Sequence, residues 1–201
     1  MKASEVIALA NQEVGYIAKK SNKDLELPEA NPIGLYTKYA QDLYNAGYYN
    51  FSKNGYDYCC VFTDWLFYHI AGSKEEAIKV KPYSILNAGI KWSKQSFADA
   101  GRLIDRPKAG ACIYFLDSKK ELAHTGIIVE VGDTTLTTVE GNVGKKVVRK
   151  TYKLGDPCID SYGWPFYEEE PEPVVDNWVT VAEWVGTDGH TLRLQKCNQL
   201  L

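Results

Sequence analysis

The sequence predicts an α+β fold in which N-terminal helices and a central buried helix pack on a small antiparallel β-sheet. Helical spacing of apolar residues runs through the first half of the 201-residue chain, and short runs of β-branched and aromatic residues follow Gly101. Because the helical patterns come first and the strand patterns second, the elements segregate as is typical of α+β proteins.

Amphipathic helices are expected on either side of the chain's most apolar segment. Residues 4–19 form the first, with Ser4 placed to cap it, and residues 35–46 form a shorter one. One or two further helices are expected across residues 74–100. Each should bury one face and leave the other in water.

Residues 58–71 are apolar on nearly every side, which is typical of a helix buried in the core. Asp57 is placed to cap the start of this helix. Gly72 is placed to end it, because glycine adopts the left-handed conformation easily. We expect this helix to be the centre of the fold.

The expected strands are short and are bounded by Gly, Asp and Lys. They lie at residues 111–115, 126–131, 136–139 and 147–152. A turn near Gly132-Asp133 joins the second to the third, and residues 162–167 form the last packed segment. Together these runs predict a small antiparallel sheet.

This pattern places a first domain at residues 1–167. An acidic, Pro-rich linker follows at residues 168–173, and a short appendage occupies residues 174–201, with a strand pattern around a turn at Asp188-Gly189. So short a piece cannot bury a core of its own. It is expected either to pack on the body or to be the stub of a larger module.

Composition excludes several classes of partner and location. The net charge is −3 and no run of Lys and Arg is present, so nucleic acid is not an expected partner. No apolar run approaches the roughly 18 residues of a membrane span, and the first residues lack a signal-peptide pattern. We expect synthesis in the cytoplasm without an export signal, and no membrane insertion.

Five cysteines are present, an odd number without a CxxC pair. We interpret them as free thiols in a reducing compartment, since a disulfide scaffold or a zinc site would need regular spacing. No His, Asp and Glu cluster has metal-site spacing, and no Asp/Asn/Gly ladder resembles a calcium loop. No metal and no cofactor are expected.

Cys59 is the candidate nucleophile because it falls in the first turn of the predicted central helix. Unpaired backbone N–H groups there favour an anion and lower the pKa of a thiol. Cys60 competes for the role, and only one of the two can face a cleft, since neighbouring helix positions point about 100° apart. The alternative interpretation of either residue is a small, buried, apolar side chain.

His124 is the candidate base at the start of a predicted strand. With the turn near residues 132–133, Glu140 or Asn142 lies directly across from it, on one face of the next strand. A carboxylate or an amide in that place can fix the tautomer and orientation of an imidazole. Taken alone, each of these residues is also compatible with a solvated strand end.

Four segments in order resemble the CHAP domain (cysteine, histidine-dependent amidohydrolase/peptidase), a family of the papain-like NlpC type. The start of the family's central helix, its next strand, its histidine strand and its acidic and amide positions resemble residues 54–65, 106–115, 124–128 and 139–142, respectively. The similarity extends over about residues 3–167. It implies a papain-like fold for that part of the chain.

The resemblance also implies an enzyme that hydrolyses bacterial peptidoglycan. Cys59 would be the nucleophile and His124 the base, with Glu140 orienting the imidazolium and Asn142 supporting it. The bond cut would be the amide between muramic acid and L-alanine, or a bond within the stem peptide or cross-bridge. A variant without Cys60 should still clear purified cell walls.

Three aromatic residues near these segments are expected to line a substrate groove, namely Tyr58, Trp92 and Trp164. The alternative for each of them is core packing. No sequence feature separates these two roles.

The resemblance implies a phage or prophage lysin that is released to the wall through a holin pore. Residues 174–201 would then be a truncated wall-binding unit, a linker to one, or an oligomerisation strand. Two other functions remain open, a non-catalytic wall-binding module and a cysteine protease or deamidase acting on proteins. The oligomeric state stays open as well.

Overall fold

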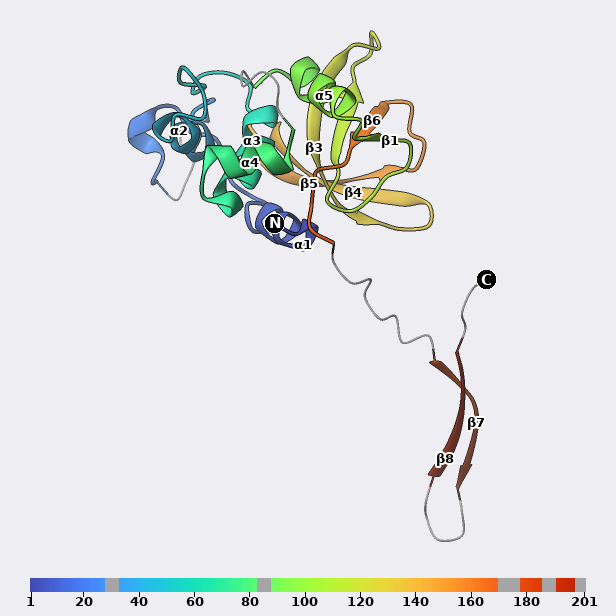
Figure 1. The fold of residues 1–201 in the computed structure, drawn as a ribbon. Helices are drawn as coiled ribbons and strands as arrows, with labels where there is room; N and C mark the ends of the chain where they lie inside the picture. Colours follow the sequence, from blue (N-terminus) through green and yellow to red (C-terminus); the bar gives the residue numbers. More distant parts are fainter. Residues whose placement is uncertain (28–32, 83–87, 170–177, 186–190, 198–201) are drawn as a thin grey trace. The chain divides into compact units, whose positions relative to one another are not determined.

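The computed structural model describes residues 1–27, 33–82, 88–169, 178–185 and 191–197. The chain divides into two compact units, Met1–Glu169 and Glu170–Leu201 (Figure 1). In the second unit, β7 (Trp178–Val185) and β8 (Thr191–Cys197) pair antiparallel, so the predicted strand pattern is confirmed. The turn at Asp188-Gly189 and most of the proposed linker lie outside the described residues.

The first unit is built on a six-stranded sheet in which every pairing is antiparallel. Its strand order is β1-β6-β2-β3-β4-β5. The strands are β1 (Leu103–Ile104), β2 (Cys112–Leu116), β3 (Leu122–Val131), β4 (Thr135–Val143), β5 (Lys146–Lys153) and β6 (Ile159–Gly163). Together with the helices before it, this sheet confirms the predicted α+β fold.

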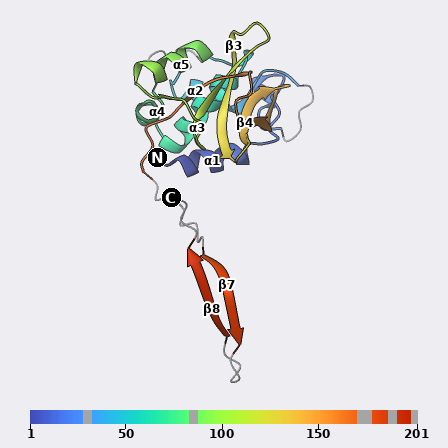
Figure 2. The same ribbon diagram turned by 90° about the vertical axis from the view of Figure 1, so that its right-hand side faces the viewer.

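In the part of the chain that the structure describes, five α-helices precede the sheet. They are α1 (Ala3–Gln12), α2 (Lys38–Asn45), α3 (Cys59–Ala71), α4 (Lys74–Val80) and α5 (Ile90–Asp99). Helix α3 contacts α1, α2 and α4 on one side and strands β3 and β4 on the other. Figures 1 and 2 show it at the centre of the first unit, beside the sheet. It is the predicted central helix.

The expected first helix, at residues 4–19, is shorter than predicted. It ends at Gln12, and Gly15 then takes a φ of 97°, which interrupts the helix. The N–H of Gly15 bonds the carbonyl of Val147, and Ile17 forms a bridge with Lys146. The apolar residues after the helix therefore pack against β5 as extended chain.

The two predicted N-caps are also wrong. The N-cap of α1 is Lys2, whose N–H donates to the side chain of Glu5, and Ser4 lies inside the helix. The N-cap of α3 is Tyr58, without a side-chain cap, while Asp57 bonds elsewhere. At the other end of α3, Gly72 has the predicted left-handed conformation.

Helix α3 lies unusually close to strand β4. A Cβ built on Gly141 would stand 2.6 Å from the Cβ of Phe62, so only glycine permits this approach without a shift. Phe62 is fully buried and occupies the second turn of α3. This contact determines how closely the start of α3 packs against β4.

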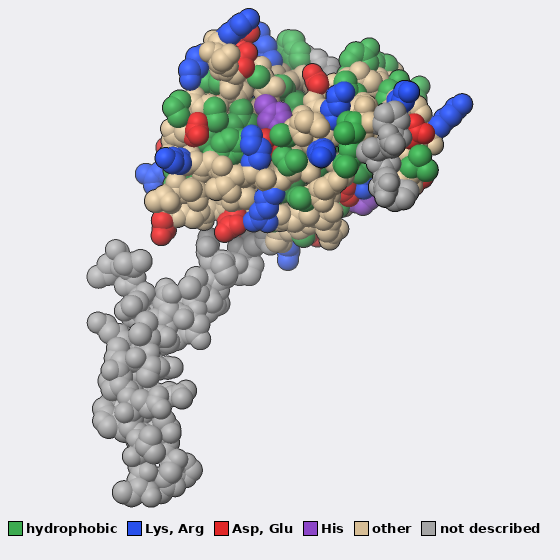
Figure 3. Space-filling view, turned by 180° about the vertical axis from the view of Figure 1, so that it is seen from behind, with side chains coloured by type: hydrophobic (Ala, Val, Ile, Leu, Met, Phe, Trp, Pro, Cys, Tyr) green, Lys and Arg blue, Asp and Glu red, His purple; other side chains and the backbone are tan. Residues whose placement is uncertain are grey.

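The surface of the first unit mixes charge signs. Lys, Arg, Asp and Glu side chains are interspersed among apolar ones on the face in Figure 3. Within the described part of the chain, no helix is both long enough and apolar enough to span a bilayer.

Candidate active site

Cys59 is the first residue of α3 and is 5% exposed. The first hydrogen bond of the helix runs from the N–H of Phe62 to the carbonyl of Tyr58. The N–H groups before Phe62 therefore have no acceptor within the helix, and they give this end a partial positive charge. The sulfur of Cys59 lies in a field that favours a thiolate.

His124 lies on β3, opposite Phe115 of β2, and its side chain is 23% exposed. Its Nε2 lies 2.9 Å from Oε2 of Glu140. Its ring and the side chain of Cys59 act on each other as hydrogen-bonding and charged neighbours, so that each shifts the pKa of the other. Because Nε2 is occupied by the carboxylate, Nδ1 is left for the sulfur.

Glu140 is fully buried, and its carboxylate is held from several sides. The hydroxyl of Thr138 donates to Oε1 at 2.6 Å, and the hydroxyl of Tyr152 donates to the same oxygen at 2.8 Å. Burial alone would raise the pKa of Glu140, but the hydrogen bonds, led by that of His124, outweigh it and lower the pKa. The carboxylate therefore stays charged beside the imidazole.

Gly126 makes room for this carboxylate. A Cβ at Gly126 would stand 2.7 Å from Cγ of Glu140 and 2.9 Å from the carbonyl oxygen of Val139. Gly126 follows His124 by two positions on β3 and shares its face. The side chain of Glu140 thus crosses β3 over a glycine to reach the histidine.

The pKa of Cys59 is lowered and the pKa of His124 is raised. A side-chain hydrogen bond from Cys60, followed by the hydrogen bond and charge of His124, outweighs burial and lowers the pKa of Cys59 to about 5. Burial opposes a charged His124, but hydrogen bonds and charges from Cys59 and Glu140 outweigh it and raise its pKa to about 9. Between these values the pair exists as thiolate and imidazolium.

Cys60 differs from its neighbour in exposure and in charge state. It is 1% exposed, and its hydrogen bond with Cys59 and its burial raise its pKa well above that of a free thiol. It therefore remains a thiol whose S–H can donate to the sulfur of Cys59. This arrangement favours Cys59 over Cys60 as the candidate nucleophile.

Asn142 is not brought to the imidazole. Its side-chain amide donates to Oδ1 of Asp57 at 2.7 Å. The β4–β5 ladder shifts register between Glu140 and Val143, and Asn142 has a φ of 66°. This irregularity breaks the alternation that would have placed Asn142 on the same face as Glu140.

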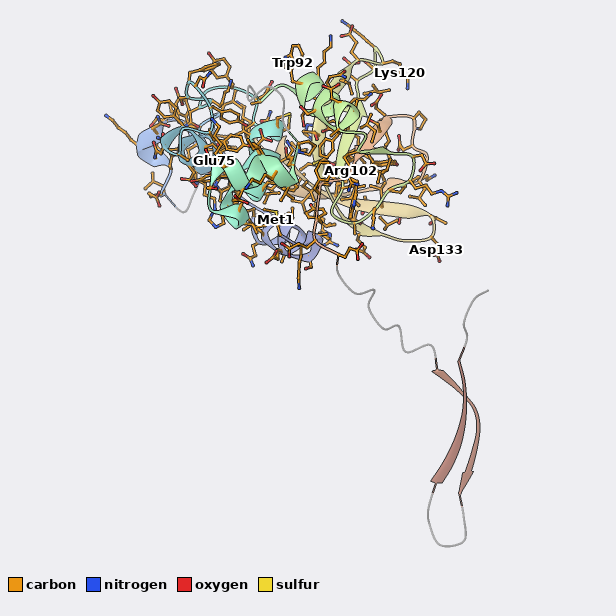
Figure 4. The ribbon with its side chains drawn as sticks, in the orientation of Figure 1. Met1, Glu75, Trp92, Arg102, Lys120 and Asp133 are labelled. Atoms are coloured by element: carbon orange, nitrogen blue, oxygen red, sulfur yellow. The ribbon has the colours of Figure 1, made fainter. Side chains whose placement is uncertain are left out.

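The three aromatic residues expected to line a groove have different environments. Tyr58 is fully buried and packs on Tyr39, so it is a core residue and does not face substrate. Trp92 is 41% exposed on the outer side of α5 (Figure 4). Trp164 is half-buried, with the ammonium of Lys108 at 4.3 Å from its ring centroid.

The sequence did not point to Thr138, Tyr152 or Gly126 as parts of the site. Thr138 carried a signal, because it precedes Glu140 by two positions on the same strand face. Tyr152 lies on β5, whose register with β4 was not predicted. In the described ranges, no group of three or more His, Cys, Asp or Glu side chains is arranged to hold a metal ion.

Residues 51–142 match the family model of the CHAP domain. This stretch contains Cys59, His124 and Glu140, and the match supports a cysteine- and histidine-dependent amidohydrolase or peptidase. A search of curated proteins found no match. A solved structure described as "The crystal structure of Ly7917" is similar, with 14% sequence identity and a TM-score of 0.47. The similarity covers 82% of this chain and 62% of that one.

Proposed function

We propose that this protein hydrolyses amide bonds of bacterial peptidoglycan by cysteine nucleophilic catalysis. The observation that carries the proposal is the joint placement of three groups. Cys59 starts a buried helix, its thiol and the imidazole of His124 shift each other's pKa, and Nε2 of that ring lies 2.9 Å from the buried carboxylate of Glu140. The family match over residues 51–142 supports the same chemistry.

The first half of the reaction forms a thioester. The thiolate of Cys59 attacks the amide carbonyl carbon, and the carbonyl electron pair moves to oxygen. His124, which holds a proton, donates it to the amide nitrogen as the C–N bond breaks, so that a neutral amine leaves. Glu140 keeps the ring oriented in both protonation states.

The second half regenerates the enzyme. The now neutral His124 takes a proton from water, and the resulting hydroxide attacks the thioester carbon. The C–S bond then breaks and releases a carboxylic acid and the thiolate of Cys59. The proton taken from water stays on His124, which restores the starting thiolate and imidazolium. Each tetrahedral oxyanion would be stabilised by the N–H of Cys59 at the helix start, and such a donor is typically worth ~3–4 kcal/mol.

Two kinds of peptidoglycan bond are candidates for cleavage. The bond cut is either the muramoyl–L-alanine amide or a bond within the stem peptide or cross-bridge. We propose a phage or prophage lysin that is made in the cytoplasm and reaches the wall after release through a holin pore. Residues 174–201 would then be a truncated wall-binding unit, a linker to one, or an oligomerisation strand.

Wall clearing by matched variants tests the chemistry. Cys59→Ala should abolish the clearing of purified cell walls, and Cys60→Ala should retain it. Clearing by Cys59→Ala that equals the wild type would end the thiol mechanism. Sedimentation of Cys59→Ala with walls, without any clearing by the wild type, would instead indicate a non-catalytic binding module.

Mass spectrometry of the digestion products identifies the bond. A new N-terminal alanine on the released peptide marks an amidase, and a new glycine or D-residue terminus marks an endopeptidase. A parallel digestion of a denatured protein tests the remaining alternative. Rapid cleavage or deamidation of that protein, with intact walls, would favour a protein substrate.

A further inference from the structure

A cavity of about 370 Å³ opens on the loop that leads into Cys59. It falls within the range of about 300–1,000 Å³ typical of small-ligand sites. Its described lining consists of Phe51, Lys53, Tyr56, Asp57 and Ala88. None of these residues takes part in the thiol–imidazole–carboxylate arrangement.

One wall of the cavity is tied directly to the catalytic elements. Asp57 lies two residues before Cys59 and accepts a hydrogen bond from the amide of Asn142. Asn142 follows Glu140 by two positions on β4. A ligand in the cavity would therefore contact the loop that leads into the start of α3.

Lys53 gives this cavity a distinctive chemistry. The residue is only 6% exposed, and burial lowers the pKa of its ammonium. That ammonium lies 3.6 Å from the ring centroid of Phe51 and 5.3 Å from that of Tyr49. Among the described residues, no carboxylate pairs with it. A largely desolvated cation without an anion is costly, and a bound anion would offset that cost.

The other lining groups suit a peptide. Phe51 is 55% exposed and Tyr56 is 62% exposed, so both present an accessible aromatic face at the cavity. One carboxylate oxygen of Asp57 is used by Asn142, and the other is able to accept a peptide N–H. The cavity thus presents a cation, two aromatic faces and one acceptor.

We infer that this cavity is a specificity subsite that binds a carboxylate of the wall peptide beside the amide to be cut. Lys53 pairs with the carboxylate, Phe51 and Tyr56 cover the apolar part of the peptide, and Asp57 receives a backbone N–H. The inference rests on the proposed function for the identity of the peptide. The carboxylate belongs either to a side chain of the peptide or to its C-terminus.

The test uses binding, so that it does not depend on turnover. Muropeptides are prepared in matched forms, with one carboxylate either free or converted to a carboxamide, in one series at a side chain and in another at the C-terminus. Affinities are measured by calorimetry on the full chain carrying Cys59→Ala. We expect the free acid of one series to bind at least about tenfold more tightly than its amide, as a charge-assisted hydrogen bond would give.

Variants at Lys53 assign the preference to this cavity. Adding Lys53→Met should bring the acid-to-amide ratio close to one, while Lys53→Arg, which keeps the charge, should preserve it. Two results would overturn the subsite. One is equal binding of acid and amide, in both series, by the protein that retains Lys53. The other is a preference for the acid that persists in Lys53→Met. Activity that survives Cys59→Ala would overturn the thiol mechanism and leave this binding result standing.

Discussion

Oε2 of Glu140 lies 2.9 Å from Nε2 of His124, so the buried carboxylate determines which nitrogen of the ring faces the sulfur of Cys59. Thr138 and Tyr152 hold the other carboxylate oxygen. An imidazole fixed in this way loses little orientation entropy when it moves a proton, and its charged form is stabilised. The fully buried carboxylate is thus the positioning element of the candidate site.

Replacing Glu140 by Gln tests this role. The amide keeps the size of the side chain but removes the charge that raises the pKa of His124. We expect kcat/KM for wall peptides to fall by roughly 10²-fold, the lower range for acid–base contributions, and the alkaline limb of the pH profile to move to lower pH. An alkaline limb that does not move would show that the carboxylate has only a structural role.

The pH dependence of kcat/KM should be bell-shaped. Activity needs a deprotonated Cys59, whose pKa is lowered to about 5, and a protonated His124, whose pKa is raised to about 9. Rates should therefore rise with pH through about 5, stay level near neutrality and fall through about 9, as apparent values of the coupled pair. A rate that only starts to rise near the pKa of a free thiol would contradict the thiolate–imidazolium pair.

Cys60 should tune the nucleophile without replacing it. Its hydrogen bond is the largest influence that lowers the pKa of Cys59, so Cys60→Ala should retain wall clearing but raise that pKa. Titration of the thiolate absorbance at 240 nm in Cys60→Ala and in Cys60→Ser measures the shift. We expect Ser, which keeps a donor, to lie closer to the wild type. Identical titrations for all three proteins would remove the role of Cys60.

Gly126 should be required for activity because of the space it leaves for Glu140. In Gly126→Ala the new Cβ would meet Cγ of Glu140 at 2.7 Å, which pushes the carboxylate away from His124. We expect at least a tenfold loss of kcat/KM, since a misplacement of about 1 Å can cost roughly 10²-fold.

The matched control is Gly132→Ala, at the end of the same strand. A Cβ at Gly132 would meet the carbonyl oxygen of Thr135 at 3.6 Å and its Oγ1 at 3.9 Å, both ordinary contacts. This variant should keep full activity. Similar losses in both variants, or a Gly126→Ala protein with unchanged kcat/KM, would count against the steric argument.

The sequence was most informative where one pattern had one structural solution. The apolar run at residues 58–71 predicted the central helix, because only burial accommodates a helix without a polar face. The turn near residues 132–133 predicted the hairpin register closely enough to bring Glu140 to His124. Strand pairs sum to 266 at Ile127↔Val139 and to 267 at Val131↔Leu136. A single bulge accounts for the difference.

The sequence was less informative where tertiary contacts decide. Strand β6 (Ile159–Gly163) carries polar residues and is held by its pairing with β2, so its own pattern is weak. Asn142 left the predicted face because of a register shift that alternation alone does not reveal. Asp57 looked like a helix cap, but its carboxylate bonds Asn142, which is distant in sequence.

A second buried network includes Asp64, one turn after Cys60 in α3. The side chains of Asp64 and Lys81 are both completely buried and form an ion pair. The hydroxyl of Tyr49 donates to Asp64, and the ammonium of Lys81 donates to Ser93 at 3.3 Å. Burial opposes the charge on Lys81, but Asp64 outweighs it and raises the pKa of the lysine. Lys81 is therefore held as an ammonium in the core.

Removing one charge of this pair should destabilise the first unit strongly, because the other charge is then buried without a counterion. We expect Lys81→Met to lower the free energy of unfolding by about 3–5 kcal/mol, and the double change Lys81→Met with Asp64→Leu to recover most of it. Urea unfolding followed by tryptophan fluorescence measures both. Lys79→Met is the matched control, in the last turn of α4 just before Lys81, since its pair with Glu76 is exposed and its loss should change stability by at most about 0.5 kcal/mol. A Lys81→Met protein as stable as Lys79→Met would show that the buried pair does not hold α3 to the segment after α4.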